Sequence, residues 1–401
     1  MKIAVVTSFP PSKVTLNEYG YHLVKNFVNK EEVTELVLLT DKTKQPKQLD
    51  FENADKVIVK ECWSFNNCAN LFTVMKEILK EKPDAVLFNL QFVKFGDKKI
   101  PAALGLMLPM LTRITGIKNI TLLHNIMETV DLEQAGFSKS KIMSKVYNAI
   151  GTSLTRCLLA SNLAAVTINK YMEIIKNKYH ANNVILMPHG SFEKAKSPNF
   201  SLPAGPKKIM AFGKFGTYKK VETMIEAAEM LRAKGMNDIE VVIAGTDSPN
   251  TPGYLESVKQ KYSHIPGLVF TGYVEENEVE RIFTESAVVV FPYTSTTGSS
   301  GVLHQAGSYG KAVVMPNLGD LAHLVEDEGY RGEFFTPGDA LSMAQAMENI
   351  LTNDGYRRSI AMANYNAAEA LSMEKITDMY IAHFNELRGK KINEQALLGN
   401  M

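Results

Sequence analysis

Cysteine, long apolar runs and excess charge are all scarce in this sequence, and each scarcity excludes a class of protein. The three cysteines, Cys62, Cys68 and Cys157, are an odd number without metal-ligand spacing, which favours structural thiols in a reducing compartment. No apolar stretch is long enough for a transmembrane helix, and the first apolar run is too short for a secretory signal, so we expect a cytoplasmic protein. The formal net charge of +1 gives no reason to expect nucleic acid as a partner.

Familiar nucleotide and metal motifs are missing as well. The sequence has no P-loop pattern, and its first turn, residues 8–16, lacks the paired glycines of a dinucleotide fingerprint. These absences argue against a kinase, an NTPase and an NAD enzyme of the usual kind. There is no Asp-x-Asp, and the nearest acidic cluster, Glu326–Glu328, is expected on a solvated helix end, so no metal site is predicted.

What the sequence does have is a regular alternation of short apolar runs and longer amphipathic segments. Because the apolar runs are hydrophobic throughout, they predict α/β domains with parallel sheets covered by helices on both faces. Strands are predicted at 3–8, 35–40, 56–60, 85–90, 119–124, 164–168, 184–188, 208–212, 240–245, 268–272, 287–293 and 311–315. Helices are predicted at 17–29, 68–81, 100–116, 139–160, 169–179, 219–235, 253–262, 275–285, 299–309, 320–327, 339–352, 356–370 and 371–388.

The length of 401 residues suits two domains better than one core. Residues 191–208 are rich in Pro, Ser and Lys without periodicity, which predicts a linker. We therefore expect two Rossmann-like, doubly wound domains at 1–192 and 193–370, followed by a C-terminal segment at 371–401. Two such domains facing each other form a cleft, and ligands of open α/β sheets bind at the carboxyl ends of the strands.

Two segments at predicted strand ends in the second domain are candidates for an anion site. In Phe212–Lys220, Gly213 precedes Lys214 and Lys219, and ammonium groups beside a helix N-terminus suit a phosphate. In the other segment, Gly298, Ser299, Ser300 and Gly301 supply amides and hydroxyls where a helix begins. The alternatives are a solvated lysine-rich loop for the first segment and an ordinary strand-to-helix corner for the second.

Two histidines end predicted strands of the first domain. His124 follows the run NITLL, and a polar side chain there is either a group of the active site or a capping residue. His189, in Pro-His-Gly, is more simply interpreted as a turn residue near the linker. The very apolar stretch 100–116 is interpreted as a buried crossover helix, with peripheral contact to the inner face of a membrane as the alternative.

Taken in order, these segments resemble the retaining glycosyltransferases of family 4 (group 1), which have the GT-B fold. MKIAVVTSFPP is similar to the family's opening strand and loop, and FGKFGTYKKVETMIEAAEML to its GR-x-x-x-x-KG turn. VVIAGTD, LVFTGYVEENEVERIFTESAVVVFPY and GSSGVLHQAGSYGKAVVM follow in the expected order. The resemblance covers nearly the whole chain. It implies a metal-independent transfer of a hexose from a nucleotide-diphosphate sugar, linked to UDP or GDP, to a glycan or lipid-linked acceptor in polysaccharide biosynthesis.

The resemblance also implies roles for individual residues. The donor binds mainly the second domain and the acceptor mainly the first. Lys214 and Lys219 take the places of the family's phosphate-binding Arg and Lys, and His124 that of a His near the donor sugar. Amides from Ser299 to Val302 bind the diphosphate, and the helix 371–388 packs back on the first domain. No cofactor is implied beyond the donor substrate.

One departure from the family pattern leaves alternatives open. The family has Glu-x7-Glu where this chain has Thr297 and Gln305. Gln305 retains an amide that can hydrogen-bond ribose hydroxyls, but Thr297 brings no charge. A GT-B protein that binds a nucleotide or glycan without transferring sugar is therefore the alternative, and a sugar-nucleotide epimerase is a third hypothesis that lacks a convincing set of acid–base groups.

Overall fold

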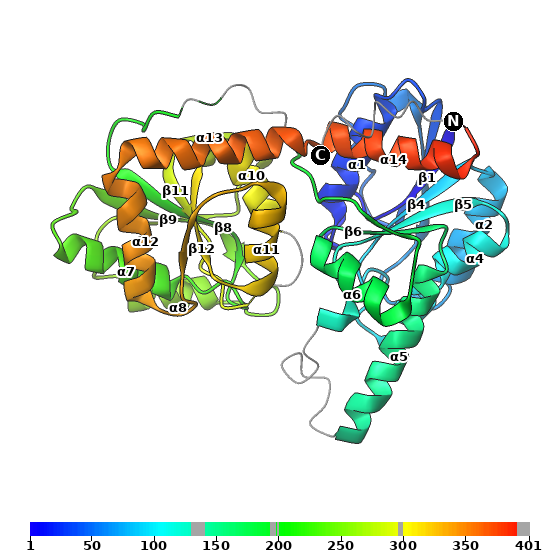
Figure 1. The fold of residues 1–401 in the computed structure, drawn as a ribbon, viewed down its shortest axis with the longest axis horizontal. Coiled ribbons are helices and arrows are strands. Elements are labelled where there is room, and N and C mark those ends of the chain that lie inside the picture. The colour runs from blue at the N-terminus through cyan, green and yellow to red at the C-terminus, as the bar shows by residue number, and fades with distance from the viewer. Residues whose placement is uncertain (130–140, 193–197, 199, 296–299, 391–401) are drawn as a thin grey trace. The chain divides into compact units, whose positions relative to one another are not determined.

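The protein, represented by a computed structural model that describes residues 1–129, 141–192, 198, 200–295 and 300–390, consists of two compact units (Figure 1). Unit 1 comprises Met1–His189 and the chain from Met373 onward, and unit 2 comprises Gly190–Ser372. The predicted boundaries, 192/193 and 370/371, lie within a few residues of these limits. Each unit is a parallel sheet with helices packed against it, as the sequence predicts.

The sheet of unit 1 has seven parallel strands in the order β3-β2-β1-β4-β5-β6-β7. The strands are β1 (Lys2–Val6), β2 (Glu35–Asp41), β3 (Val57–Trp63), β4 (Ala85–Leu90), β5 (Lys118–Leu123), β6 (Leu163–Val166) and β7 (Val184–Leu186). In the central strand β1, Ile3 pairs with Leu36 on one side and with Ala85 on the other. The central strands are buried on both faces, which explains why their sequences are apolar throughout.

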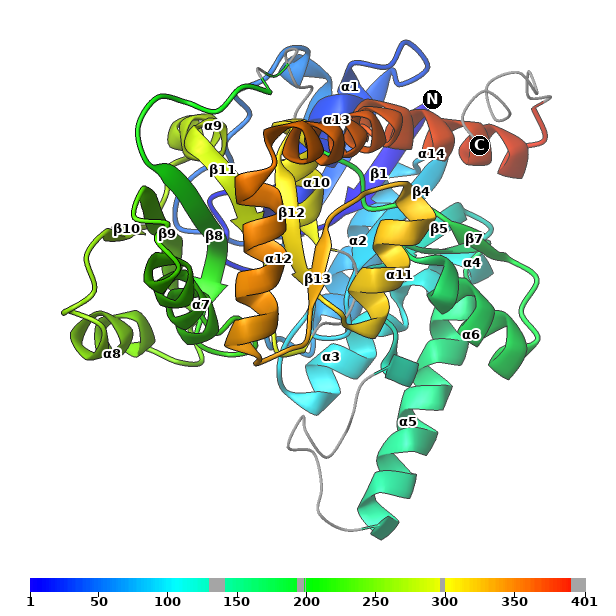
Figure 2. The same cartoon turned by 60° about the vertical axis from the view of Figure 1, so that its left-hand side comes forward.

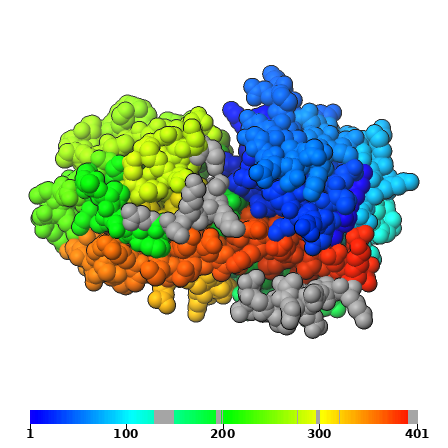
Figure 3. Space-filling view, turned by 90° about the horizontal axis from the view of Figure 1, so that it is seen from above, coloured from blue at the N-terminus to red at the C-terminus, as the bar shows by residue number. Residues whose placement is uncertain are grey.

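Helices of unit 1 follow the strands at nearly the predicted places. They are α1 (Asn17–Val28), η1 (Ala54–Lys56), α2 (Asn70–Glu81), α3 (Lys99–Leu106), α4 (Leu108–Ile114), η2 (Met127–Thr129), α5 (Lys141–Leu159), α6 (Asn169–Tyr179) and α14 (Met373–Leu387). The last helix, α14, lies against α1, where the Tyr380 and Phe27 rings are 6.0 Å apart and Lys30 pairs with Asp378 at 2.6 Å. Figure 3 shows this red helix against the blue N-terminal segments of the same unit.

The apolar stretch 100–116 forms two helices where the sequence predicts one. The chain breaks between α3 and α4 because Pro109, which has no backbone N–H, occupies the first turn of α4. Leu106 and Leu108 at the break are buried, whereas Ile100 and Ile114 near the outer ends are 67% and 73% exposed. No helix in the described part of the chain is long and apolar enough to cross a membrane.

The sheet of unit 2 has six parallel strands in the order β10-β9-β8-β11-β12-β13. The strands are β8 (Lys207–Phe215), β9 (Ile239–Asp247), β10 (Leu268–Gly272), β11 (Ser286–Val290), β12 (Ala312–Pro316) and β13 (Glu333–Phe335). The sequence does not predict β13, because three residues at a sheet edge are too few for a periodic pattern. The prediction also ends β8 three residues too early, at Phe212.

The helices of unit 2 enclose this sheet, and Figure 2 shows α12 in front of β12 and β13. They are α7 (Glu222–Ala233), α8 (Tyr254–Lys261), α9 (Glu276–Glu285), α10 (Gly301–Ser308), α11 (Gly319–Glu328), α12 (Ala340–Thr352) and α13 (Asp354–Ala370). Of the predicted linker 191–208, residues 193–197 and 199 lie outside the described residues. Ser191 donates from its amide to Leu371 and from its hydroxyl to Ala368, so the start of the unit is bound to its end.

Each sheet has one position where the strand order reverses. In unit 1 the reversal lies between β1 and β4, and in unit 2 between β8 and β11. At such a position the loops that follow the two strands diverge and leave a crevice at their carboxyl ends, where ligands of doubly wound sheets bind. In unit 2 these are the loops that lead to Lys219 and to α10, the two segments singled out as an anion site.

Candidate active site

The first candidate segment differs locally from its prediction. Gly213 and Lys214 are residues of β8 rather than of a turn, and Lys214 pairs in register with Thr246 of β9. The turn comes later, where the Gly216 amide donates to the Lys219 carbonyl at 3.0 Å, and α7 begins only at Glu222. Lys214 is exposed and Lys219 is buried, so the two predicted phosphate ligands have different surroundings.

Gly213 is required where it stands. Its φ is +129°, a conformation that L side chains rarely adopt, and a β-carbon there would lie 2.6 Å from Lys219 Nζ. Its register partner Gly245 has φ +140°, and a β-carbon on Gly245 would lie 1.9 Å from the Gly213 carbonyl oxygen. Two glycines at the carboxyl ends of β8 and β9 thus let the Lys219 ammonium group lie against the backbone.

The Lys219 ammonium group has few hydrogen-bond acceptors. Among the described residues its one hydrogen bond is a long one, 3.5 Å to the Phe212 carbonyl oxygen. It also lies over the Tyr293 ring, 4.8 Å from the centroid, and more distantly over Tyr218 at 5.9 Å. Because burial disfavours the charged form, the pKa of Lys219 is lowered from its usual value. An ammonium group with three donors and one weak acceptor is well suited to bind an anion.

Tyr293 connects Lys219 to the second candidate segment. The backbones of Lys219 and Tyr293 form an isolated antiparallel β-bridge. The Lys220 amide donates to the Pro292 carbonyl, and the Thr294 amide donates to the Tyr218 carbonyl, at 2.8 Å each. The Tyr293 side chain lies close to Ser300, the residue that precedes α10. Burial raises the pKa of Tyr293 above its usual value and outweighs the opposing effect of Ser300. The structure therefore brings Lys219 together with the beginning of α10.

Ser300 does not cap α10 as the sequence suggests. It occupies the N-cap position in extended backbone conformation, but its side chain makes no capping hydrogen bond. The first amides of the helix, from Gly301 and Val302, thus have no side-chain cap. Gly301, Val302 and Gln305 are half-buried. Thr297, Gly298 and Ser299 lie outside the described residues, so the predictions for them stay predictions.

In unit 1, His124 lies in a polar cluster at the carboxyl ends of β4 and β5. Its Nε2 is 2.7 Å from Asn89 Oδ1, and Asn89 donates from Nδ2 to Thr7 at 2.9 Å. Since Asn89 presents a carbonyl oxygen to the ring, Nε2 carries the proton and donates. Burial holds the pKa of His124 well below its usual value, and the nearby His189 and Lys94 lower it further. The imidazole is neutral and held in one orientation.

His189 belongs to the same cluster. Its ring meets the Tyr19 ring edge to face at 4.8 Å, and Tyr19 meets His124 at 4.5 Å. The His124 and His189 ring centroids are 5.7 Å apart. The two histidines singled out from the sequence, which are distant along the chain, are therefore neighbours in unit 1.

Lys94 is a residue that the sequence analysis overlooks. It is fully buried in the loop after β4, and its Nζ donates to Ser8 Oγ at 2.5 Å and to the Thr15 carbonyl at 2.8 Å. Burial lowers the pKa of Lys94 to about 7. The polar residues directly after β4, beginning with Gln91, could have indicated a loop at the carboxyl end of that strand. Nothing in the sequence, however, marks a lysine of this loop as buried.

The acidic cluster near the end of α11 also differs from expectation. Glu326 and Asp327 are exposed, but the side chain of Glu328 is only 5% exposed. Its Oε2 is 3.6 Å from Nδ1 of His304 in α10, and His304 Nδ1 is 2.9 Å from the Tyr330 hydroxyl. Neither carboxylate oxygen has a hydrogen-bond partner among the described residues, and burial raises the pKa of Glu328 to about 8. The expectation of a fully solvated cluster is wrong for Glu328.

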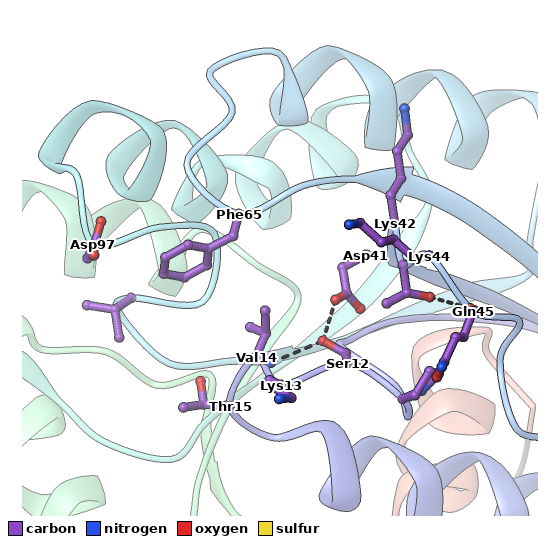
Figure 4. A pocket seen from close by; sticks show the side chains of 13 residues that line it. Ser12, Lys13, Val14, Thr15, Asp41, Lys42, Lys44, Gln45, Phe65 and Asp97 are labelled. Atoms are coloured by element: carbon purple, nitrogen blue, oxygen red, sulfur yellow. Dashed lines mark hydrogen bonds between the residues drawn. The ribbon is translucent and has the colours of Figure 1, made fainter. Parts of the chain in front are cut away.

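Cavities lie in both units. The larger, about 780 Å³, is in unit 1 at the carboxyl ends of β1 to β4 (Figure 4), and the smaller, about 280 Å³, is in unit 2 beside α9. The smaller one includes Lys208, the second residue of β8, and Ser286, the first residue of β11, and none of the described donor candidates. Within the described chain, no three His, Cys, Asp or Glu side chains are arranged to hold a metal ion.

Residues 206–353, which make up most of unit 2, match the family described as glycosyl transferases group 1. No curated protein matches the sequence. The matched segment includes β8, Lys219, α10 and Glu328, and so contains all the described donor candidates.

Solved structures show the fold of the whole chain. Sucrose-phosphate synthase from Thermosynechococcus elongatus is 17% identical with a TM-score of 0.73, over 97% of this chain and 99% of that one. A glycosyltransferase from Rickettsia africae is 15% identical with a TM-score of 0.69, over 97% and 99%. Anabaena HepE, solved in complex with UDP-glucose, is 14% identical with a TM-score of 0.65, over 96% and 100%. The chain has the GT-B fold, and its residues 206–353 match the family of group 1 glycosyl transferases.

Proposed function

We propose that this enzyme transfers a hexose from a UDP-linked donor to a glycan or lipid-linked acceptor, with retention of anomeric configuration and without a metal ion. The structure of Anabaena HepE was determined with UDP-glucose, and that of a trehalose-6-phosphate synthase from E. coli with UDP-2-fluoro glucose. These relatives favour UDP over GDP as the nucleotide of the donor. Retention of anomeric configuration and independence from metal ions are implied by the resemblance of the motifs to those of the family.

The surroundings of Lys219 are the observation that best supports the proposal. Its buried ammonium group has one weak acceptor and lies at the reversal of the strand order, beside the beginning of α10. A helix N-terminus has free amides and a partial positive charge, so it attracts the same kind of group as the ammonium does. The combination suits a diphosphate.

Such a site favours departure of the nucleotide. When the bond between the sugar and the diphosphate breaks, negative charge grows on the leaving oxygen, and a fixed cation in a dehydrated site stabilises that charge. Lys219 supplies this cation, and the amides of Gly301 and Val302 supply hydrogen-bond donors. Lys214, which is exposed on β8, supplies a second positive charge at the same strand end. We assign His124 to the sugar, as a neutral hydrogen-bonding group.

One observation supports the alternative of a protein that binds a nucleotide without transferring sugar. Gln305 stands in α10 where the family has a carboxylate, and its amide brings no negative charge. A ribose hydroxyl can be bound by either group. Sustained release of UDP from UDP-glucose would exclude the alternative.

A thermal-shift series with UDP, GDP, ADP, CMP and dTDP, in the presence of EDTA, tests the donor site. A ligand at about 100 times its Kd adds roughly 2.7 kcal/mol of stability, which raises the Tm of a chain of this size by a few degrees. We expect the shift with UDP and its loss in Lys219→Met. Lys220→Met is a matched control, because Lys220 lies over the Tyr254 ring at the same 4.8 Å but bonds the Gly216 carbonyl. No shift with any diphosphate contradicts the proposal.

A further inference from the structure

A buried histidine in the first turn of α10 has no role in the donor site as described above. His304 is the fourth residue of α10 and is 1% exposed. Its amide donates to the Ser300 carbonyl at 3.4 Å, and the Leu303 amide donates to the same oxygen at 2.9 Å. The His304 ring is therefore attached to the turn whose free amides, from Gly301 and Val302, are the candidate phosphate ligands.

Two side chains compete for one nitrogen of the His304 ring. Nδ1 lies 2.9 Å from the Tyr330 hydroxyl and 3.6 Å from Oε2 of Glu328. An imidazole nitrogen without a proton accepts a hydrogen bond, and one with a proton donates. The Tyr330 hydroxyl can donate to an unprotonated Nδ1, whereas an ionised carboxylate needs a protonated Nδ1. In the structure the shorter distance is the one to Tyr330.

Glu328 is kept in the state that is compatible with the contact between His304 and Tyr330. Its side chain is 5% exposed, and neither carboxylate oxygen has a hydrogen-bond partner among the described residues. Burial raises the pKa of Glu328 to about 8, and the charge of Asp327 contributes to this rise. Near neutral pH Glu328 is therefore an uncharged acid, which does not need a protonated Nδ1 beside it.

Ionisation of Glu328 changes this arrangement. Once the acid has released its proton to solvent, a buried anion without a hydrogen-bond donor is unfavourable. His304 Nδ1, at 3.6 Å, is close enough to become that donor after a small rotation of the ring. When Nδ1 carries a proton and donates to Oε2, it no longer accepts from the Tyr330 hydroxyl. The ring then moves towards α11, and the first turn of α10 is displaced with it.

The groups that face Glu328 come from three segments. They are His304 of α10, Tyr330 in the segment before β13, and Asp327 of its own helix. The helix α13 also packs on α10, and there it contributes Asn364, an uncharged side chain that is hydrogen-bonded to backbone groups. Burial raises the pKa of Tyr330 well above its usual value, so its hydroxyl keeps its proton. The proton that can leave this cluster near pH 8 is the one on Glu328.

The second turn of α10 is packed too tightly to move in the same way. A β-carbon on Gly307 would lie 2.7 Å from the Tyr330 ring and 2.7 Å from the Asn364 carbonyl oxygen. The absence of a side chain at Gly307 thus allows a close contact between α10 and α13. A rotation of the His304 ring is therefore accommodated by the first turn of α10, which is the turn nearest the proposed phosphate site.

We propose that His304 and Tyr330 position the first turn of α10 for the nucleotide sugar, and that protonated Glu328 maintains this position. Loss of the Glu328 proton turns His304 towards α11 and weakens the binding of a nucleoside diphosphate. The three residues are positioning residues, because they act through α10. The inference rests on the proposed function in one respect: it takes the amides of α10 as the phosphate site.

Calorimetric titration with UDP in the presence of EDTA, at about pH 6.5 and about pH 9, tests the effect on binding. The ratio of the Kd at the higher pH to that at the lower pH should be about threefold or more larger in the wild type than in Glu328→Gln, which cannot ionise. The exposed Glu326→Gln is the matched control and should follow the wild type. Lys219 also loses charge as pH rises, but it does so in all three proteins, so the comparison isolates Glu328.

Tyr330→Phe tests the hydrogen bond that holds His304. This variant removes the hydroxyl but keeps the aromatic ring, whose centroid is 5.5 Å from that of His304. Because Nδ1 then has no phenol hydroxyl to accept from, we expect UDP to bind about threefold more weakly than to the wild type already at the lower pH. Wild-type affinity of Tyr330→Phe at that pH would contradict the role assigned to Tyr330.

Nuclear magnetic resonance of the full-length protein, labelled with ¹⁵N in its histidines, gives a readout that needs no UDP. The His304 signals are assigned by their loss in His304→Asn. They should report an unprotonated Nδ1 at the lower pH and a protonated Nδ1 at the higher pH, and no such change in Glu328→Gln. The inference is overturned if Nδ1 keeps the same state at both pH values in the wild type.

The two readouts separate the inference from the proposed function. If UDP binds with the same pH dependence in the wild type and in Glu328→Gln, the inference fails and the proposed function stands. If UDP binds to none of the proteins at either pH, the proposed function fails, and with it the part of the inference that concerns the nucleotide. The histidine signals then still decide whether Glu328 controls His304.

Discussion

The crevices of the two units are built on the same plan but present their lysines differently. Both lie where the strand order of a doubly wound parallel sheet reverses. In unit 1 the cavity is roomy and its lysines, among them Lys13 and Lys42, are exposed. In unit 2 the decisive lysine, Lys219, is buried against Gly213 and two tyrosine rings. Exposed cations attract a ligand while they keep most of their hydration, whereas a desolvated cation interacts more strongly with a charge that forms during a reaction. Under the proposed function, the second crevice is the one suited to stabilise the leaving group.

The largest effect expected from this comparison is the loss of turnover in Lys219→Met. Removal of the buried ammonium group should lower kcat at least 100-fold, about 2.7 kcal/mol of transition-state stabilisation. UDP release from UDP-glucose measures the rate, and Lys220→Met should stay near the wild type. A wild-type rate in Lys219→Met would contradict the proposal that Lys219 stabilises the leaving group.

A smaller effect is expected from Gly213→Ala, which displaces the Lys219 side chain instead of removing it. The new methyl group would lie 2.6 Å from Lys219 Nζ. We expect turnover to fall roughly tenfold, together with a loss of stability of about 1–3 kcal/mol from the strained backbone. Gly235→Ala is the control, because Gly235 also has a positive φ, +95°, but nothing lies within 4 Å of its β-carbon position. If turnover falls equally in both variants, backbone strain is responsible for the loss and the displacement of Lys219 is not.

The buried Glu328 makes the stability of unit 2 depend on pH. Its pKa is raised from 4.5 to about 8, so between these values the folded protein keeps a proton that the unfolded chain releases. Stability should therefore fall as pH rises through this range, by at most about 1.4 kcal/mol per pH unit. Glu328→Gln should reduce this slope in urea unfolding, and the exposed Glu326→Gln should not. The facing groups are His304, Tyr330 and Asp327, and a protonated His304 would oppose the trend.

Chelation should have the smallest effect. If Lys219 and the amides of α10 supply the positive charge in unit 2, EDTA should leave turnover with UDP-glucose unchanged, and added Mg²⁺ should not raise it. The same reaction, followed by the anomeric signals of the product, should show retained configuration. Loss of activity on chelation that Mg²⁺ restores would contradict the metal-free mechanism.

The architecture of this protein can be predicted from its sequence, and the candidate donor residues can be singled out there. The apolar runs predicted all but one of the strands, because strands buried on both faces leave a signal that needs no neighbour to be recognised. Gly213, Lys214 and Lys219 were candidates because a glycine and cations at a strand end form a local pattern. The short strand β13 gave no such pattern and was missed.

The burial and contacts of these residues depend on the tertiary structure. Burial of Lys219 depends on Gly213 and on Tyr293 from a loop more than seventy residues away. Lys94 and Glu328 have unremarkable neighbours in the sequence, yet both are buried, since burial is determined by the segments that pack over a side chain. The cavity of unit 1 is likewise a joint product of four loops. Periodicity can be recognised from consecutive residues, whereas solvation, pKa and cavity shape depend on distant residues that the fold brings together.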